Sequence, residues 1–263
     1  MTALDPSGEP TVLLQQRSWW GSHGGAWGPP GGARDSHESE FGAALREAEE
    51  ECAIDSTAVV VHGVLRDDHG GWTYRTVLAS APKPFAATAV SEETRTVAWV
   101  PATDVELLNL HPGFAEQWEA LRTVLLPLTI IVDAANVMGS RPDGWWRDRA
   151  GAASRLMNQV AELATKGVTS LPDSVDVPEL ERWFPVYVVV LEGAAAAAPD
   201  PVRAENRGLR VVRASGSGDD EIARLAAELP EPALVITADR ELRGRCEKAG
   251  ASVAGPRWLL DQL

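Results

Sequence analysis

Apolar and polar positions follow different patterns in the two halves of the chain. In the first half, short apolar runs bounded by turn residues predict strands, and two longer segments with the composition and spacing of helices separate them. The expected strands cover residues 11–16, 58–65, 72–80 and 96–100, and the expected helices cover residues 40–52 and 114–125. This mixture of elements predicts an α/β unit.

From Pro127 onward, predicted strands alternate regularly with predicted helices. The strands cover residues 129–132, 186–191, 209–212, 234–237 and 251–254, and the helices cover residues 145–166, 219–228, 240–249 and 257–263. Such alternation predicts a mostly parallel sheet with helices on both faces. We therefore expect two domains, residues 1–126 and residues 127–263, both of α/β class. The alanine-rich run 194–198 is read either as a helix start or as a loop.

Composition narrows the class of protein. The 263 residues, 44% hydrophobic and 24% charged, are typical of a soluble globular protein of two domains, and no uncharged apolar run is long enough to predict a membrane span. Two cysteines far apart in the sequence, with no secretory signal, lead us to expect the cytoplasm. The net charge of −14 argues against a broad basic surface for nucleic acid, so an anionic substrate would need bridging metal ions or a local basic patch.

Three glutamates share one face of the first predicted helix. Glu47, Glu50 and Glu51 stand at positions i, i+3 and i+4, so their carboxylates lie close together and repel each other unless a cation neutralises them. Ligands of oxygen alone suit Mg²⁺ or Mn²⁺. A glutamate cluster by itself is more often a solvated helix face, so the case depends on the surrounding pattern.

That surrounding pattern resembles the Nudix box. Gly32 is followed after five residues by Glu38 and after seven more by the run Arg-Glu-Ala-Glu-Glu-Glu-Cys-Ala-Ile, which ends at Ile54. The box has a glycine where this chain has Ala53, and we expect that difference to affect how the helix turns into the next strand rather than metal binding. The resemblance covers residues 1–125.

The resemblance implies an α/β/α sandwich with a mixed sheet, and hydrolysis of a nucleoside diphosphate linked to another group. It implies that Glu47, Glu50 and Glu51 bind Mg²⁺ or Mn²⁺, helped by a backbone carbonyl at Gly31 or Gly32. The catalytic base is expected to be Glu50 or Glu93.

Other positions around the box carry expected supporting roles. Arg46 would pair with Glu38 or Glu47 and so hold the helix to the preceding loop. Trp27, in a glycine-rich loop before the box, is a candidate for contact with the substrate, where an indole could stack on a base. Residues 1–4 are too short for the full first strand that the family has. Either the true start lies upstream or the sheet has a shortened edge.

In the second half, acidic residues follow the predicted strands. They are Asp133, Glu192, Asp219, Asp220 and Asp239. The carboxyl ends of parallel strands line one crevice, and carboxylates gathered there are the arrangement that two-metal phosphodiester hydrolysis requires. Any one of them alone is more often a helix cap or turn residue.

Together, these positions resemble a PIN-like NYN ribonuclease domain over residues 128–263. The resemblance is carried by Val-Asp-Ala-Ala-Asn ending at Asn136, Gly-Asp-Asp ending at Asp220, and Thr-Ala-Asp-Arg-Glu-Leu ending at Leu242. It implies an α/β/α domain in which Asn136 positions backbone or substrate, and Glu192 departs from the expected aspartate. The implied metal-binding acids are Asp133, Asp219, Asp220 and Asp239, of which Asp133, Asp219 and Asp239 are the catalytic candidates. The implied RNA contacts are Arg141, Arg147, Arg149, Arg240 and Arg243.

The leading hypothesis is a Nudix hydrolase joined to a ribonuclease, acting on a nucleotide and on RNA. Two alternatives remain. The chain is a pyrophosphohydrolase for the nucleotide pool with a vestigial or RNA-binding second domain, or it is a nucleotide sensor without turnover. The sequence leaves the nucleotide, the preferred metal and the oligomeric state open.

Overall fold

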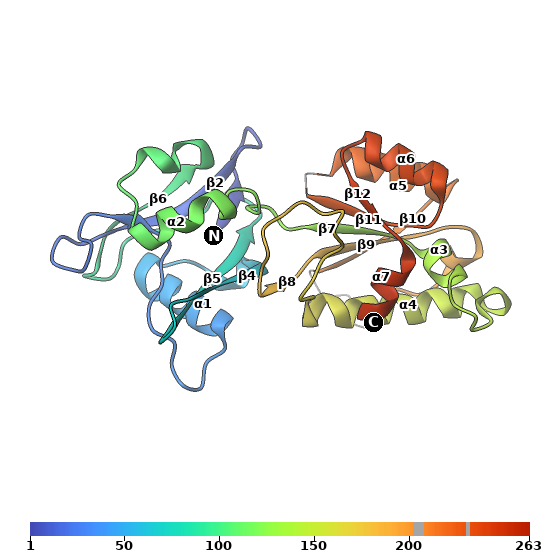
Figure 1. Ribbon diagram of the computed structural model, residues 1–263, viewed down its shortest axis with the longest axis horizontal. Helices are drawn as coiled ribbons and strands as arrows, with labels where there is room; N and C mark the ends of the chain where they lie inside the picture. The colour runs from blue at the N-terminus through green and yellow to red at the C-terminus, as the bar shows by residue number, and fades with distance from the viewer. Residues whose placement is uncertain (202–207, 230–231) are drawn as a thin grey trace. The chain divides into compact units, whose positions relative to one another are not determined.

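The computed structural model describes residues 1–201, 208–229 and 232–263, and the chain divides into two compact units (Figure 1). The first unit contains Met1–Leu126 together with Val177–Glu181, and the second contains Pro127–Asp176 and Arg182–Leu263. The sequence pattern did not indicate that Val177–Glu181 groups with the first unit. Within the described part of the chain, none of the helices has the length and apolar character needed to span a bilayer.

A mixed sheet forms the centre of the first unit. Its strands are β1 (Thr2–Leu4), β2 (Pro10–Arg17), β3 (Trp27–Gly28), β4 (Val60–Asp68), β5 (Thr73–Ala81) and β6 (Thr94–Pro101). They lie in the order β3-β2-β1-β5-β4, and β6 pairs with β2. Among the described pairs of strands in this unit, β1–β5 is parallel and the others are antiparallel, so the predicted mixed sheet is confirmed.

The short strand β1 lies inside the sheet. It pairs antiparallel with β2, and Thr2 and Ala3 pair parallel with Ser80 and Ala81 of β5. The hydroxyl of Thr2 donates a 2.6 Å hydrogen bond to the carbonyl of Leu125, which ties the strand to the end of the unit's main segment. The alternative of a shortened edge is therefore wrong: the strand is short, but both of its sides are paired.

Two α-helices, α1 (Glu40–Cys52) and α2 (Pro112–Leu121), accompany this sheet. The hydroxyl of Ser39 caps α1 by accepting a 3.1 Å bond from the amide of Gly42. Buried Ala48 and Cys52 pack against Leu13 of β2, which fixes the helix against the sheet. The predicted bounds of α1 are confirmed. Two 3₁₀ helices, Ser56–Ala58 and Ala102–Leu107, complete the unit.

The end of α1 explains the glycine that the Nudix box has and this chain lacks. Ala53 has φ 51° and ψ 39°, the left-handed conformation, and its amide donates a 3.0 Å bond to the carbonyl of Glu49. Residues with a Cβ atom are disfavoured there by about 1–2 kcal/mol, whereas glycine is not.

We expect the variant Ala53→Gly to be more stable than the wild type by about 0.5–1 kcal/mol. Relief of the left-handed strain outweighs the larger entropy that glycine has in the unfolded chain. Urea unfolding of the full chain measures the difference. The matched control is Ala44→Gly in the interior of α1, where glycine should destabilise by about 0.5–1 kcal/mol. A lower stability of Ala53→Gly would contradict the strain argument.

A buried histidine makes the stability of this unit depend on pH. His62 of β4 is 2% exposed, and its Nε2 lies 3.4 Å from the carbonyl of Val124. Burial lowers the pKa of His62 to about 4 from its ordinary 6.5. Between these two pH values the unfolded chain binds the extra proton, so stability is retained above pH 6.5 and falls as the pH drops toward 4.

We expect His62→Leu to reduce this loss by up to about 1.4 kcal/mol per pH unit. The free energy of unfolding measured by urea at several pH values between 4 and 7 tests it. The variant His37→Gln, at an exposed histidine, should leave the slope unchanged. An identical slope in His62→Leu and wild type would show that other groups cause the acid sensitivity.

The second unit contains a parallel sheet whose central strand is first in sequence. Its strands are β7 (Thr129–Asp133), β9 (Val186–Leu191), β10 (Leu209–Arg213), β11 (Ala233–Ile236) and β12 (Ser252–Ala254). They lie in the order β10-β9-β7-β11-β12, and the four pairings between these strands are parallel, in agreement with the mostly parallel sheet that was predicted. The chain builds outward from β7 to one side and then to the other. Such a reversal opens a crevice at the carboxyl ends of the central strands.

Helices cover both faces of this sheet. They are α3 (Ala134–Gly139), α4 (Arg149–Lys166), α5 (Gly218–Glu228), α6 (Arg240–Lys248) and α7 (Pro256–Gln262). Figure 1 shows α5 and α6 on one face and α4 on the other. Ile222 of α5 and Leu242 of α6 pack with Ile131 and Val235 in one buried cluster.

One prediction for this unit needs correction, and one helix was not predicted. The predicted helix 145–166 is a 3₁₀ turn, Trp145–Arg147, followed by α4, because Asp148 accepts a 2.8 Å bond from the amide of Gly151 and starts a new helix. The short helix α3 was not predicted. The alanine-rich run forms the 3₁₀ helix Gly193–Ala197.

Candidate functional site

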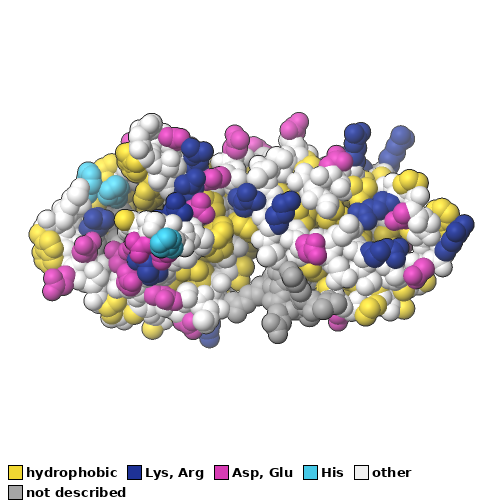
Figure 2. Space-filling view, turned by 90° about the horizontal axis from the view of Figure 1, so that it is seen from below, with side chains coloured by type: hydrophobic (Ala, Val, Ile, Leu, Met, Phe, Trp, Pro, Cys, Tyr) yellow, Lys and Arg dark blue, Asp and Glu magenta, His cyan; other side chains and the backbone are white. Residues whose placement is uncertain are grey.

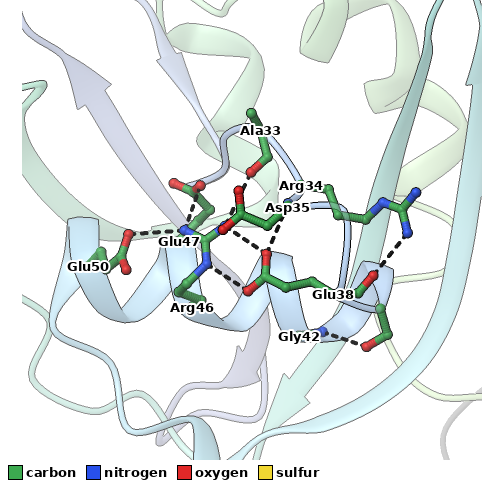
Figure 3. Close-up of polar contacts among 9 residues, drawn as sticks. Ala33, Arg34, Asp35, Glu38, Gly42, Arg46, Glu47 and Glu50 are labelled. Carbon is green, nitrogen blue, oxygen red and sulfur yellow. Dashed lines mark hydrogen bonds and ion pairs between the residues drawn. The ribbon is translucent and has the colours of Figure 1, made fainter.

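One arginine gathers the carboxylates of the box (Figure 3). Arg46 of α1 donates two bonds to Glu38, of 2.8 and 3.0 Å, and its Nη1 lies 2.9 Å from Glu47 and 3.1 Å from Glu50. A further bond of 3.2 Å reaches the carbonyl of Ala33. The bonds from Arg46 lower the pKa of Glu38. Both expected partners of Arg46 are confirmed, and the guanidinium holds the loop to the helix.

Glu51 is the buried member of the cluster. The residue is 7% exposed. Its Oε2 accepts hydrogen bonds from the amide of Gly31 (2.9 Å) and from Nε2 of Gln15 (2.8 Å). Burial raises the pKa of Glu51, and the charges of Glu47 and Glu93 raise it further, while the two bonds oppose them. The first unit therefore brings Glu47 and Glu93 each within electrostatic reach of Glu51.

Glycine at position 32 allows the loop to lie directly against Glu47. A Cβ atom added to Gly32 would stand 2.6 Å from both oxygens and from the carboxyl carbon of Glu47. The obstacle is the far end of a flexible side chain, so a larger residue would displace the carboxylate rather than break the fold.

We expect Gly32→Ala to reduce turnover by about 10-fold or more with little change in stability, because the carboxylate of Glu47 must move away from its place beside the loop. Steady-state kinetics and thermal unfolding of the same preparation separate the two effects. Gly71→Ala, where the added Cβ meets no atom within 4 Å, is the control. Unchanged turnover in Gly32→Ala would show that the position of Glu47 is unimportant.

The loop that carries Glu93 is anchored to the end of β2. Ser18 donates from its hydroxyl to the carbonyl of Glu92 (2.6 Å) and from its amide to the carbonyl of Glu93 (2.8 Å). The side chains of Glu92 and Glu93 are exposed. Since Gln15 bonds both Glu51 and the hydroxyl of Thr94, the loop and the helix meet through one amide side chain.

The groups that this cluster offers as metal ligands are carboxylates, which suit a hard divalent cation such as Mg²⁺. Over the described ranges of the chain, no three Asp, Glu, His or Cys side chains are arranged to hold a metal ion. Arg46 is the cation that lies between Glu47 and Glu50. Figure 2 shows acidic side chains gathered with histidines on the first unit.

Two cavities of the first unit border this cluster. The larger, about 450 Å³, is lined by the rings of Trp72, Tyr74 and Phe114 and is called the aromatic cavity below. Gln15 and Gly31, the two residues that bond Glu51, also line it. The second cavity, about 390 Å³, lies along α1 and includes Glu47.

Trp27, expected to touch the substrate, is not a lining residue of either cavity. Its backbone pairs with the amide of His111 and the carbonyl of Asn109, at 2.7 and 2.8 Å, and so places His111 in the wall of the aromatic cavity. Tyr74 and Thr76 of β5, and Trp72 just before it, line this cavity but were not predicted as site residues. Their alternation in the sequence, at every second position, was the available signal.

In the second unit, Asp133 and Asn136 join the carboxyl ends of β7 and β11. Asp133 is 4% exposed and accepts bonds from Asn136 (3.0 Å from the amide, 2.8 Å from Nδ2) and from the hydroxyl of Thr237 (2.8 Å). The side-chain oxygen of Asn136 accepts from the amide of Ala238 at 3.3 Å. Asn136 thus has a positioning role between the two strands.

Four carboxylates share this edge of the sheet. Burial raises the pKa of Asp219, and the charges of Asp133, Asp239 and Glu192 raise it further, while Arg245 opposes them. Glu192 itself accepts a 2.7 Å bond from the amide of Gly218 and so holds the start of α5.

Asp239, one of these four, and Asp220 also have structural partners. Asp239 caps α6 by accepting a 2.8 Å bond from the amide of Leu242. Asp220 is exposed and forms a 2.8 Å ion pair with Arg245.

Of the five arginines expected to contact RNA, three are exposed and two are held by hydrogen bonds. Arg147, Arg149 and Arg240 are exposed, and Arg149 lies over the ring of Trp145 at 5.4 Å. Arg141 and Arg243 donate to Gln159 (2.8 Å) and to the carbonyl of Thr237 (3.5 Å). Figure 2 shows Lys and Arg side chains gathered over the second unit.

Comparison with known proteins places the first half of the chain. Residues 1–123 match the NUDIX domain family. The putative 8-oxo-dGTP diphosphatase 3 of Mycobacterium tuberculosis is 43% identical over 136 residues, which are 49% of this chain and 61% of that protein. A nucleoside triphosphate pyrophosphatase/Nudix hydrolase fusion protein of Bifidobacterium longum is 40% identical over 119 residues, 43% of this chain and 24% of that protein.

A solved structure of a Nudix hydrolase, RenU from M. smegmatis, is 40% identical and covers 47% of this chain and 80% of its own, with a TM-score of 0.45. The chain spans less than two thirds of the length of the M. tuberculosis and B. longum relatives.

Proposed function

Because residues 1–123 of this chain belong to the NUDIX domain family, we propose that the first unit hydrolyses the pyrophosphate linkage of a nucleoside diphosphate joined to another group. The observation that carries the proposal is the carboxylate cluster on α1. Glu47 lies against Gly32 and lines the cavity along α1, while Glu51 is bonded to Gly31, which lines both cavities. Each cavity is large enough for a nucleotide.

Each residue of the cluster has a role in this proposal. Glu47, Glu50 and Glu51 would hold Mg²⁺ or Mn²⁺, with the carbonyl of Gly31 or Gly32. When bound, the metal orients and activates a water molecule and neutralises charge on the pyrophosphate. Arg46 orients Glu47 and Glu50 through its ion pairs.

The catalytic base is assigned to Glu50 or Glu93, which are both exposed side chains at the cluster. Glu50 is held by Arg46, whereas the loop of Glu93 is held through its backbone. The variant Glu93→Gln distinguishes the two, because Glu50 is also a proposed metal ligand and Glu93 is not. If Glu93 is the base, Glu93→Gln lowers kcat without weakening Mn²⁺ binding; an unchanged kcat in Glu93→Gln assigns the role to Glu50.

The aromatic cavity is the proposed binding site of the nucleoside. It reaches Glu51 through Gln15 and Gly31, so a nucleoside there would place its phosphates beside the cluster. The name of the M. tuberculosis relative makes an oxidised guanine nucleoside triphosphate one candidate substrate. Sugar nucleotides and dinucleotides are the other candidates.

Product analysis tests this function. The full chain is incubated with nucleoside triphosphates, sugar nucleotides and dinucleotides in Mg²⁺ or Mn²⁺, in water labelled with ¹⁸O. We expect a nucleoside monophosphate product, label in one phosphate product, and loss of turnover with a chelator. Absence of turnover with every substrate and both metals would leave the unit a nucleotide sensor.

For the second unit, we propose metal-dependent cleavage of RNA by an NYN-like ribonuclease site, in which Asp133, Asp219 and Asp239 would hold Mg²⁺ or Mn²⁺. Support comes from the raised pKa of Asp219, which reflects burial first and then the nearby charges of Asp133 and Asp239. Burial of like charges at the carboxyl edge of a parallel sheet is typical of functional sites.

Cleavage of end-labelled single-stranded RNA by the full chain tests the second proposal. We expect Asp219→Asn to abolish RNA cleavage and to leave nucleotide hydrolysis intact. Glu228→Gln, at an exposed position of the same helix, is the control. If wild-type protein hydrolyses nucleotides but never cuts RNA, the second unit is a vestigial or RNA-binding module and nucleotide-pool housekeeping becomes the function.

A further inference from the structure

The aromatic cavity has one wall built by a hairpin. Asp67 of β4 stands directly opposite Tyr74 of β5 in the register, and cross-strand partners point to the same face of a sheet. Tyr74 and Thr76, two residues apart on β5, share that face as well. All three line the cavity.

Two rings at the tip of this hairpin form a flat platform. The imidazole of His69 stacks on the indole of Trp72 with ring centroids 4.2 Å apart and planes 18° from parallel. Trp72 is 61% exposed, and both rings line the cavity. An exposed stacked pair at a cavity is a surface on which a nucleobase gains stacking energy.

A chain of hydrogen bonds fixes the polar groups of the same wall. The hydroxyl of Thr76 donates to Oε1 of Gln117 (3.0 Å), and Nε2 of Gln117 donates to Oδ2 of Asp67 (2.9 Å). Nε2 of His69 lies 3.2 Å from the same Oδ2. These bonds therefore fix the orientation of the Gln117 amide and of the Asp67 carboxylate.

This network leaves two groups available to a ligand. Among the described residues, no donor bonds Oδ1 of Asp67, and Nε2 of Gln117 uses one of its two hydrogens. An ionised carboxylate only accepts hydrogen bonds, while an amide nitrogen only donates them. The wall thus offers an acceptor and a donor side by side.

We propose that Asp67, held by Gln117 and His69, makes the aromatic cavity selective for a guanine-type base. The N1–H and 2-amino groups of guanine are adjacent donors that suit the carboxylate, and its O6 suits the free N–H of Gln117. Adenine presents a lone pair on N1 toward the same carboxylate, which is repulsive. This inference rests on the proposed nucleotide hydrolysis and names the residues that choose the base.

The test compares kcat/KM for dGTP, dITP and dATP. Hypoxanthine keeps N1–H but lacks the 2-amino group, so we expect the order dGTP, then dITP, then dATP. The ratio of dGTP to dATP should be about 10 or more, as for one well-placed bidentate pair. Asp67→Asn should lower that ratio by about 10-fold through a higher KM for dGTP.

Glu119→Gln is the matched control, because Glu119 is an exposed glutamate on the same helix as Gln117 and is not a lining residue of the cavity. It should keep the wild-type ratio. A loss of turnover shared equally by all three nucleotides in Asp67→Asn would indicate a structural role instead and would overturn the proposal.

Failure of the inference and failure of the proposed function give different results. If nucleotides are hydrolysed with equal kcat/KM for dGTP and dATP, the base-reading role of Asp67 is wrong and the hydrolase stands. If no nucleotide is hydrolysed, the binding of dGMP and dAMP, measured by calorimetry, tests the base-reading role of Asp67. Tighter binding of dGMP that Asp67→Asn abolishes supports the inference, and equal binding refutes it.

Discussion

The variant Glu51→Gln is expected to lose about 100-fold or more in kcat with Mg²⁺, while unfolding at no lower temperature than the wild type. The two bonds to Glu51, from Gly31 and Gln15, both end on Oε2, so the amide oxygen of glutamine can accept both. The substitution therefore removes the negative charge and little else. Burial raises the pKa of Glu51, which means that the ionised group is unfavourable in the folded state.

Activity and stability should consequently move in different directions. Steady-state kinetics, Mn²⁺ titration by calorimetry and thermal unfolding measure the three quantities on one preparation. Glu49→Gln is the control, because Glu49 is exposed and adjacent in sequence to the cluster. Turnover of Glu51→Gln within about 3-fold of wild type would remove Glu51 from the metal site, since ligand losses are larger than this.

Substitution of Ile131 by alanine should produce the largest loss of stability in the second unit, about 2–5 kcal/mol. Ile131 is fully buried on β7, where it stands between Val188 of β9 and Val235 of β11. Both faces of this central strand are covered, so the surroundings cannot collapse into the space that the side chain leaves.

Hydrogen exchange at the amides of β7, β9 and β11 measures this effect within the second unit alone. The free energy of opening should fall by the same 2–5 kcal/mol or so in all three strands. Arg210→Ala, at an exposed position of the edge strand β10, should change it by less than about 0.5 kcal/mol. If Ile131→Ala changed the free energy of opening as little as Arg210→Ala does, packing around Ile131 would not be a main source of the stability of this sheet.

Periodicity predicted most elements of both units because their apolar positions follow local rules. The bounds of α1 and of β9 agree with the predicted ranges. The elements that escaped prediction are held by single side chains rather than by a pattern. Asp133 caps α3, and Asp148 divides the predicted helix 145–166. The place of β1 between β2 and β5 depends on pairing with strands distant in sequence, which no local pattern contains.

The carboxylate cluster was predictable because its spacing is local to one helix. Helical geometry alone puts Glu47, Glu50 and Glu51 on one face. The aromatic cavity was not predictable in the same way, since it combines Asp67 with Gln117, fifty positions apart. Likewise, the sequence placed Glu192 at a strand end but did not reveal that its carboxylate is engaged by Gly218.

The segment Val177–Glu181 has a consequence for how this protein can be divided. Since it belongs to the first unit while its neighbours belong to the second, the chain passes between the units three times. A fragment ending at Leu126 lacks Glu181, whose carboxylate pairs with Arg75 at 2.8 Å and whose amide bonds the carbonyl of Val64. A gene fragment that ends at residue 126 would therefore encode the first unit without its segment Val177–Glu181.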